Sequence, residues 1–244
     1  MNSRLGILVK GELQRLNKYN VFSISVLVAM IWGIILFLLN EDLLGSLLPF
    51  VLLIDATLMG VMYIGSVTHF EKTESTISTL LVTPIKNSEL VLSKVIANTL
   101  HNAFSASLII TVFFIFKDVD VNIILVFLGI ILSTIFFTIA GLCLSYYQKD
   151  FTGMLVNIMI LSFGLLIPSA LFMFGVLTWE GWEYILLINP IQAAQEIIGG
   201  AFAGYEFTYK YYFSLGYMFF GAILLYKFVA LPKFQNYAIK QSGV

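Results

Sequence analysis

The sequence predicts an all-α polytopic membrane protein with six transmembrane helices, and two observations support this fold class. Hydrophobic residues make up 59% of the chain and charged residues only 11%, whereas soluble domains carry about 25% charged residues. Six apolar stretches each come close to the ~20 residues that a helix needs to cross a ~30 Å hydrocarbon core. Lipid rather than water must therefore surround most of this protein.

The six predicted spans follow one another along the chain, separated by more polar connections. Pro168 falls inside the fifth span and is expected to kink it, because its ring nitrogen cannot donate a helical hydrogen bond. The predicted spans are Val21–Leu39, Leu47–Thr68, Val95–Phe116, Val121–Ser145, Thr152–Thr178 and Thr208–Ala230.

The distribution of basic residues predicts the orientation of the spans. If both termini lie in the cytoplasm, all of the 13 lysines and arginines except Lys117 and Lys210 fall at or near the inner face. The outer connections are acidic instead. Because cytoplasmic loops of membrane proteins carry an excess of Lys and Arg, we expect both termini to be cytoplasmic.

The N-terminal segment is expected to be an amphipathic interfacial helix over residues 1–20. Leu5, Leu8, Val9, Leu13 and Leu16 recur on one helical face, while basic residues lie largely elsewhere. The alternative is a basic tail that only fixes the topology. The predicted organisation is this helix followed by one six-span domain over residues 21–244.

Motifs for catalysis, metal binding and nucleotide binding are missing from the sequence. There is no G-x-x-x-x-G-K-[ST] loop, no HExxH and no nucleophile elbow. One cysteine and two histidines are too few for a metal cluster, and a net charge of −1 argues against a nucleic-acid-binding face. We expect no catalytic residue, metal or cofactor in this chain.

Asp55 lies inside the second predicted span, where an ionisable side chain is costly and is a functional candidate by default. Three interpretations remain open. The carboxylate is hydrogen-bonded to neighbouring helices or faces an outer vestibule; it lines a substrate path together with Met59 and Met62; or it binds a transported proton. The last would make the protein a proton-coupled secondary transporter, but no inverted repeat or pair of broken helices is visible.

The stretch HFEKTESTISTLLVTPIKNSELVLSK, residues 69–94, is unusually charged for this chain and lies between the second and third spans. Ile77, Leu80 and Leu81 have helical spacing, and Thr83 before Pro84 ends that helix.

The residue Asn87 or Ser88 is a plausible cap for the helix that follows. The stretch thus predicts a short cytoplasmic helix held at both ends by spans, with an apolar face for a partner protein. Its expected charged rim is Glu71, Lys72, Glu74 and Lys86. The alternative is a solvated loop with incidental charge.

The run EKTESTISTLLVTPIKNSELVLSK resembles the signature of ABC type-2 transporter permeases. This resemblance implies that residues 70–93 form the coupling helix, which docks on a separate ATPase subunit. Ser75 replaces the usual glycine of the pattern. The other matching positions are Glu71, Lys72, Thr73, Glu74, Thr76, Ile77, Leu80, Leu81, Thr83, Pro84 and Lys94.

A second run, LLINPIQAAQEIIGGAF, resembles the asparagine-proline motif of the same family at Asn189 and Pro190. It implies a re-entrant hairpin at the outer face, over residues 179–207. Pro190 suits the first turn of a helix and Gly199-Gly200 can end it. The arginine often found after this motif is replaced by isoleucine.

The resemblance implies an exporter of amphipathic or hydrophobic molecules: a drug, an antimicrobial or toxin peptide, or a lipid-like compound. Two ATPase subunits would bind ATP and Mg²⁺, and a second permease copy or a paralogue would complete the complex in the bacterial plasma membrane. Two other classes stay open: a proton-coupled transporter that uses Asp55, and a membrane scaffold that transports nothing.

Overall fold

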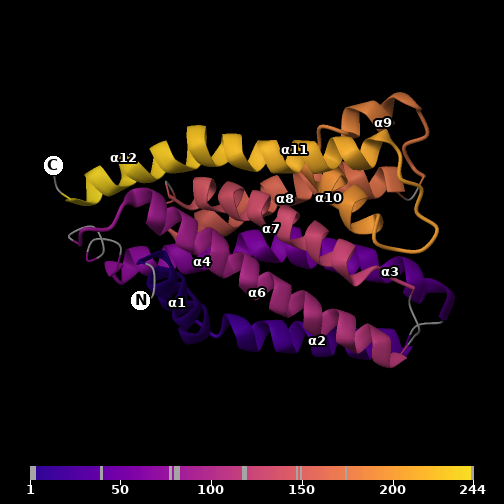
Figure 1. The fold of residues 1–244 in the computed structure, drawn as a ribbon, viewed down its shortest axis with the longest axis horizontal. Coiled ribbons are helices and arrows are strands. Elements are labelled where there is room, and N and C mark those ends of the chain that lie inside the picture. The colour runs from indigo at the N-terminus through magenta and orange to yellow at the C-terminus, as the bar shows by residue number, and fades with distance from the viewer. Residues whose placement is uncertain are drawn as a thin grey trace.

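The computed structural model describes residues 4–38, 41–76, 79, 83–116, 120–146, 148, 150–173 and 175–242. These residues are almost entirely helical, with one isolated β-bridge between Val121 and Phe202. The long helices run side by side in an elongated bundle (Figure 1). Both ends of the chain lie at the same end of this bundle, which we call the inner end.

The described helices are interrupted in two places by π-helical turns, labelled η1 and η2. In chain order they are α1 (Arg4–Lys18), α2 (Val21–Leu38), α3 (Glu41–Ile54), η1 (Asp55–Met59), α4 (Gly60–Thr73), α6 (Asn87–Phe116), α7 (Ile123–Ser145), α8 (Phe151–Met173), α9 (Gly181–Leu186), α10 (Pro190–Gly199), α11 (Tyr209–Leu225), η2 (Tyr226–Ala230) and α12 (Leu231–Ser242).

Five continuous helical stretches are long and apolar enough to cross a membrane, and α1 with α2 makes a sixth candidate as a pair bent by 60°. The prediction of a membrane protein with about six spans is therefore confirmed by the length and composition of its helices. The five continuous stretches are Leu47–Thr73, Asn87–Phe116, Ile123–Ser145, Phe151–Met173 and Tyr209–Ala238.

Two helix ends have local causes. The helix that contains the third span begins at Asn87, within one residue of the predicted cap at Asn87 or Ser88, and the Leu90 N–H donates to the Lys86 carbonyl. The Glu89 carboxylate folds back to accept a hydrogen bond from the Lys86 backbone N–H at 3.0 Å. The fifth span ends at Met173, because Gly175 (φ +70°) has the left-handed conformation that terminates helices and Val176 N–H donates to the Leu171 carbonyl.

The centre of the bundle is the stretch α3–η1–α4, of which 61% of the apolar window is buried, against 17% for α8. Its closest neighbour is α7, and a glycine allows the approach. A Cβ atom on Gly141 would lie 2.8 Å from Ile64 Cγ2 and 3.4 Å from the Val61 backbone. Small residues at helix crossings give close packing in membranes, where no hydrophobic effect drives helices together.

Helix α1 packs against the protein through the apolar face that the sequence predicted. Leu16 is buried together with Val21 at the start of α2, Tyr63 and Val67 on α4, and Ala97 on α6. The helix ends at Lys18, and Asn20, with a φ of +59°, lies in the turn where the chain bends by 60° into α2. Helix α1 is therefore anchored to α4 and α6 at the inner end of the bundle.

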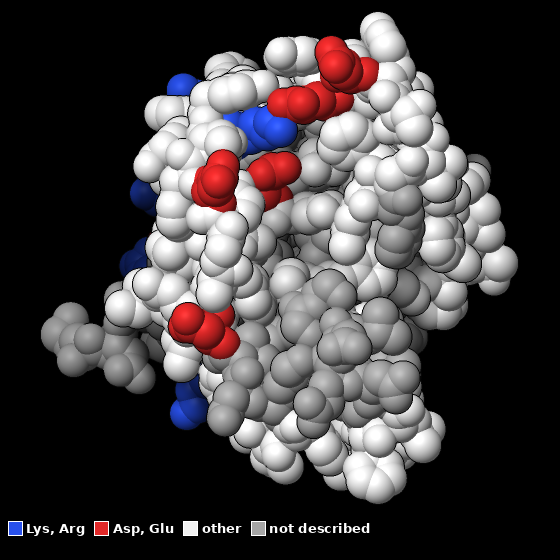
Figure 2. Space-filling model, turned by 90° about the vertical axis from the view of Figure 1, so that its right-hand side faces the viewer, with Lys and Arg blue, Asp and Glu red and all other residues white. Residues whose placement is uncertain are grey.

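The opposite, outer end of the bundle carries acidic side chains (Figure 2). They come from the connection between α6 and α7, from α9 and from the segment after α10: Asp120, Glu180, Glu183 and Glu206. Lys210 also lies at this end and forms a 2.6 Å ion pair with Glu183. The charge difference between the two ends thus matches the asymmetry expected from the sequence.

Candidate functional site

The charged stretch lies at the inner end of the bundle, where α4 leads into α6. Helix α4 continues to Thr73, so the connection begins at Glu74 and is shorter than the sequence predicted. Within it, Thr76 is half-buried, and Thr83 and Pro84 are exposed in a bend. The predicted helix with Leu80 and Leu81 lies outside the described residues, as do Ile77, Ser78 and Val82.

A buried cluster of four charged side chains lies directly beneath this connection. Glu71 on α4 is 0% exposed, and both of its carboxylate oxygens accept hydrogen bonds of 2.5 Å from the ammonium group of Lys94 on α6. Glu12 on α1 also accepts from Lys94, at 3.2 Å. Arg15 donates to both Glu12 and Glu71 at 2.8 Å. We call these four residues the ion cluster.

The ion cluster places Glu71 differently from the exposed rim that the sequence predicted. The side chain points inward from the last turn of α4 and meets cations from α1 and α6, so it cannot contact a partner directly. Burying a carboxylate is costly unless cations and hydrogen bonds compensate it, and here Lys94 and Arg15 do so. Glu71 therefore fixes the base of the connection to two other helices.

Lys72 also points into the protein instead of toward the rim. Its ammonium group donates to backbone carbonyls at the C-terminal end of α7: those of Ser145, Tyr146 (2.8 Å) and Gln148 (3.4 Å). It also lies 5.0 Å from the ring centre of Tyr237 on α12. The last carbonyls of a helix lack internal donors and attract cations, so Lys72 caps α7.

Glu74 is exposed, as predicted, but it too is held. It accepts hydrogen bonds from Lys18 at 2.9 Å and from the Tyr19 hydroxyl at 2.9 Å. The hydrogen bonds from Lys18 and Tyr19 keep the pKa of the Glu74 carboxyl below its usual value. Glu71, Lys72 and Glu74, at the end of α4 and just after it, thus bind α1, α6, α7 and the turn before α2.

Ser75 stands where the resembled signature has glycine, and the backbone explains that preference. Its φ of +55° lies in the left-handed region, where a Cβ atom is strained and glycine is not. This conformation lets the chain leave α4 immediately after the contacts of Glu71, Lys72 and Glu74.

A buried polar column crosses the middle of the bundle between η1, α6 and α7. Asp55 is 3% exposed; its Oδ1 accepts a hydrogen bond from Ser105 at 3.0 Å, and its Oδ2 has no partner. Asn102 donates to Thr134 at 3.2 Å. In the same column Asn98 donates to Thr138 at 2.7 Å and to the Gly60 carbonyl at 3.3 Å.

Sequence reasoning found Asp55 but missed its partners. Asn98, Asn102 and Ser105 recur at i, i+4 and i+7, which places them on one face of α6 and would have marked a polar stripe. The other two residues predicted for a substrate path follow Asp55 along the same helical stretch. Met59 packs in the cluster around Leu16 and Met62 packs against the main core, both half-buried.

The outer motif forms a short helix that is tied to α8. As predicted, α10 begins at Pro190 and ends at Gly199. Asn189 is its N-cap and accepts from the Ile191 N–H at 3.0 Å. The Asn189 amide also donates to the Leu165 carbonyl at 2.7 Å and to Ser169 at 3.0 Å. These contacts lie on either side of Pro168, where the helix lacks a donor.

One comparison with known proteins identifies a family. A family model described as the fluoroquinolones export permease protein family matches residues 3–242, which is nearly the whole chain. No curated protein matches the sequence.

The position of Ser75 predicts a stabilising substitution. Ser75→Gly removes the Cβ strain at φ +55° and is expected to raise stability by about 1 kcal/mol. Ser107→Gly, at a half-buried position in helix α6, is the control and is expected to lower stability by ~0.5–1 kcal/mol. Apparent melting temperatures in detergent measure both. A decrease for both variants would contradict the assigned conformation.

The ion cluster predicts that replacing one member of the Glu71–Lys94 pair by an apolar residue lowers stability more than replacing both. Glu71→Leu leaves Lys94 buried without its main partner and is expected to cost about 3–5 kcal/mol. The double variant Glu71→Leu/Lys94→Leu is expected to recover much of this loss.

The control for the ion cluster is Glu74→Gln, which removes an exposed ion pair and is expected to change the melting temperature much less than Glu71→Leu. Equal decreases in melting temperature for Glu71→Leu and Glu74→Gln would contradict the buried pairing. So would a double variant that is no more stable than Glu71→Leu.

Proposed function

The chain belongs to the fluoroquinolones export permease family, and from this premise we propose that it is the membrane subunit of an ATP-driven exporter. A separate cytoplasmic ATPase, present in two copies, would bind ATP and Mg²⁺, because the sequence has no phosphate-binding loop of its own. The chain is a transport subunit rather than an enzyme.

One observation carries this proposal: the connection after α4 is fixed to several helices at once. Glu71 binds α1 and α6, Lys72 binds the end of α7, and Glu74 binds Lys18 and Tyr19. A protein that pulls on residues 74–86 would therefore move these helices together instead of unwinding a flexible loop. Such rigid transmission is what an ATPase needs in order to act on a membrane domain.

The roles of the signature residues divide accordingly. Glu71 and Lys72 transmit force inside the permease, whereas the exposed Thr83 and Pro84 and the apolar Leu80 and Leu81 are the proposed contacts for the ATPase. A groove in the partner would receive an apolar helical face, and its neighbouring charges would set the orientation.

The proposed substrates are amphipathic aromatic compounds of the fluoroquinolone class, as the family name indicates. The spans carry few charges, so a cargo with a large apolar surface suits them better than a highly charged one. The proposed path lies between two permease copies. The sparsely buried helix α8 offers a broad apolar surface for a second copy.

The proposed location is the bacterial plasma membrane, with both termini in the cytoplasm. Two observations support this orientation: both chain ends lie at the inner end of the bundle, and acidic side chains gather at the outer end (Figures 1 and 2). Asn189 and Pro190 then belong to an outer hairpin that braces α8.

A proton-coupled transporter is the second candidate, and one observation favours it. The Asp55 carboxylate is buried in the membrane region and its Oδ2 has no hydrogen-bond partner. Buried carboxylates in transporters often carry protons. Asp55→Asn separates the candidates, because it would abolish proton-coupled transport but leave ATP-driven transport working.

The proposal predicts that an ATPase co-purifies with the tagged permease in mild detergent. Leu80→Asp places a charge on the proposed apolar contact and is expected to abolish co-purification. Leu224→Asp is the matched control, since Leu224 is exposed on α11, far along the chain from the coupling stretch.

Each variant is compared with the wild type by quantitative mass spectrometry of the eluate, at equal permease amounts. Retention of the ATPase by Leu80→Asp, or no ATPase with the wild type in several detergents, would contradict the proposed coupling site.

A further inference from the structure

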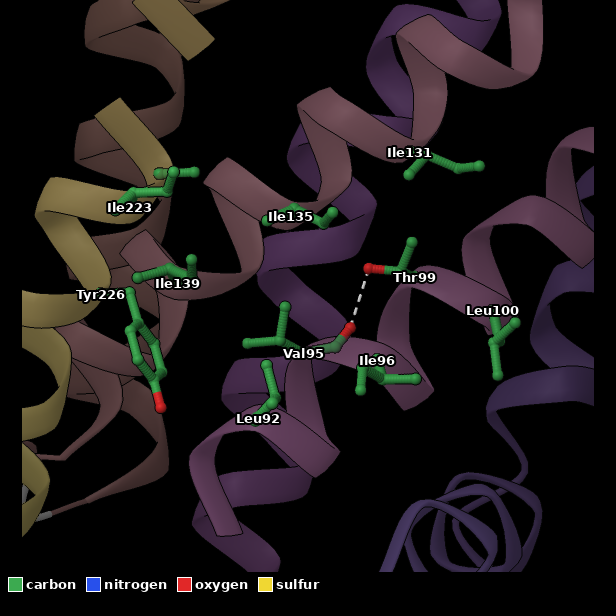
Figure 3. A pocket seen from close by; sticks show the side chains of 11 residues that line it. Leu92, Val95, Ile96, Thr99, Leu100, Ile131, Ile135, Ile139, Ile223 and Tyr226 are labelled. Atoms are coloured by element: carbon green, nitrogen blue, oxygen red, sulfur yellow. Dashed lines mark hydrogen bonds between the residues drawn. The ribbon is translucent and has the colours of Figure 1, made fainter. Parts of the chain in front are cut away.

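A groove of about 470 Å³ opens on the side of the bundle between α6, α7 and α11 (Figure 3). It begins near Leu92 and Tyr226 at its inner end and runs along α6 to Leu100. The helical rise from Leu92 to Leu100 is about 12 Å. The remaining lining is aliphatic apart from Thr99: Val95, Ile96, Ile131, Ile135, Ile139, Ala222 and Ile223.

Both hydroxyl protons in the groove are already donated to backbone carbonyls of the protein. Thr99 Oγ1 donates to the carbonyl of Val95 in its own helix at 2.8 Å (Figure 3). The Tyr226 hydroxyl donates to the Ser88 carbonyl at 3.2 Å. Burying a polar group without a hydrogen-bond partner costs free energy, so this groove favours an occupant that presents hydrocarbon.

Two lysines are close in the chain to residues at the inner end of the groove, and the Lys227 ammonium lies 5.5 Å from the ring centre of Phe228. Lys227 follows Tyr226 in η2. Lys86 lies two residues before Ser88, whose carbonyl accepts the hydrogen bond from the Tyr226 hydroxyl. Both are exposed, and among the described residues neither ammonium group forms an ion pair. Glu89 is the acidic residue at this end, and its carboxylate is turned onto the Lys86 backbone N–H.

We propose that this groove binds an anionic phospholipid. One acyl chain lies along α6 between Leu92 and Leu100, and the phosphate lies at the lysine-bearing end near Lys86 and Lys227. An apolar slot with cations at one end has the polarity of a phospholipid, whose charge and hydrocarbon are separated in the same way. The orientation proposed above makes this a lipid of the inner leaflet.

The transported drug is a poorer occupant of the same groove. Fluoroquinolone-like molecules carry polar and charged groups close to their ring system, whereas the groove lining holds neither a charged side chain nor a free hydroxyl proton. The groove is therefore assigned to a lipid that stays bound, and the transport path is elsewhere. This assignment does not depend on an ATPase partner.

Native mass spectrometry of the detergent-purified protein tests the proposal. After exchange into mild detergent, phosphatidylglycerol and phosphatidylethanolamine are titrated separately. The wild type is expected to hold one phosphatidylglycerol per protomer and to bind phosphatidylethanolamine more weakly. Lys86→Ala/Lys227→Ala is expected to weaken phosphatidylglycerol binding about 30-fold, which two lysine–phosphate attractions provide. Arg4→Ala/Lys10→Ala removes the same charge from the exposed face of α1 as a control.

Ile96→Trp tests the hydrocarbon site separately, because the larger side chain fills the groove from its edge. It is expected to abolish retention, whereas Ile34→Trp on the exposed face of α2 is expected to preserve it. The proposal is overturned if the wild type retains no phospholipid or if controls and groove variants lose lipid equally. It is also overturned if the two phospholipids bind alike, or if a fluoroquinolone displaces the lipid and is itself held.

Discussion

The contact between Glu71 and Lys94 determines how the inner end of this protein is built. It buries two opposite charges between the end of α4 and the first turns of α6. Arg15 and Glu12 on α1 balance these charges. Removing one member would leave a buried charge without compensation, so these three helices stay in one arrangement. The connection between α4 and α6 is therefore attached to a rigid base, and Lys72 extends that base to α7.

A rigid inner end contrasts with the less uniform middle of the bundle. There α3 and α4 are joined by a π-helical turn that starts at Asp55, and the polar column holds oxygen atoms with no hydrogen-bond donor. Interruptions of this kind are common at functional sites of helices.

The spans were predictable because membrane thickness sets helix length, and the polarity of the ends followed from the lysines and arginines. What the sequence could not provide was the direction of individual side chains. Glu71 and Lys72 read as exposed charges, because nothing local indicates that Lys94 and the end of α7 face them across the fold. The polar stripe beside Asp55 was missed for another reason, because the spacing of Asn98, Asn102 and Ser105 along one helix does indicate it. The start of α10 at Pro190 was predictable, since it depends only on the residues beside it in the chain.

The most direct test of ATP-driven export is fluoroquinolone uptake into inside-out membrane vesicles that contain the permease and its ATPase. Uptake is compared with ATP, without ATP, and with ATP plus a protonophore that dissipates the proton gradient. We expect ATP-driven export, with uptake that requires ATP and persists with the protonophore. Uptake that proceeds without ATP on an imposed proton gradient, and stops with the protonophore, would contradict it and favour a transporter that uses Asp55.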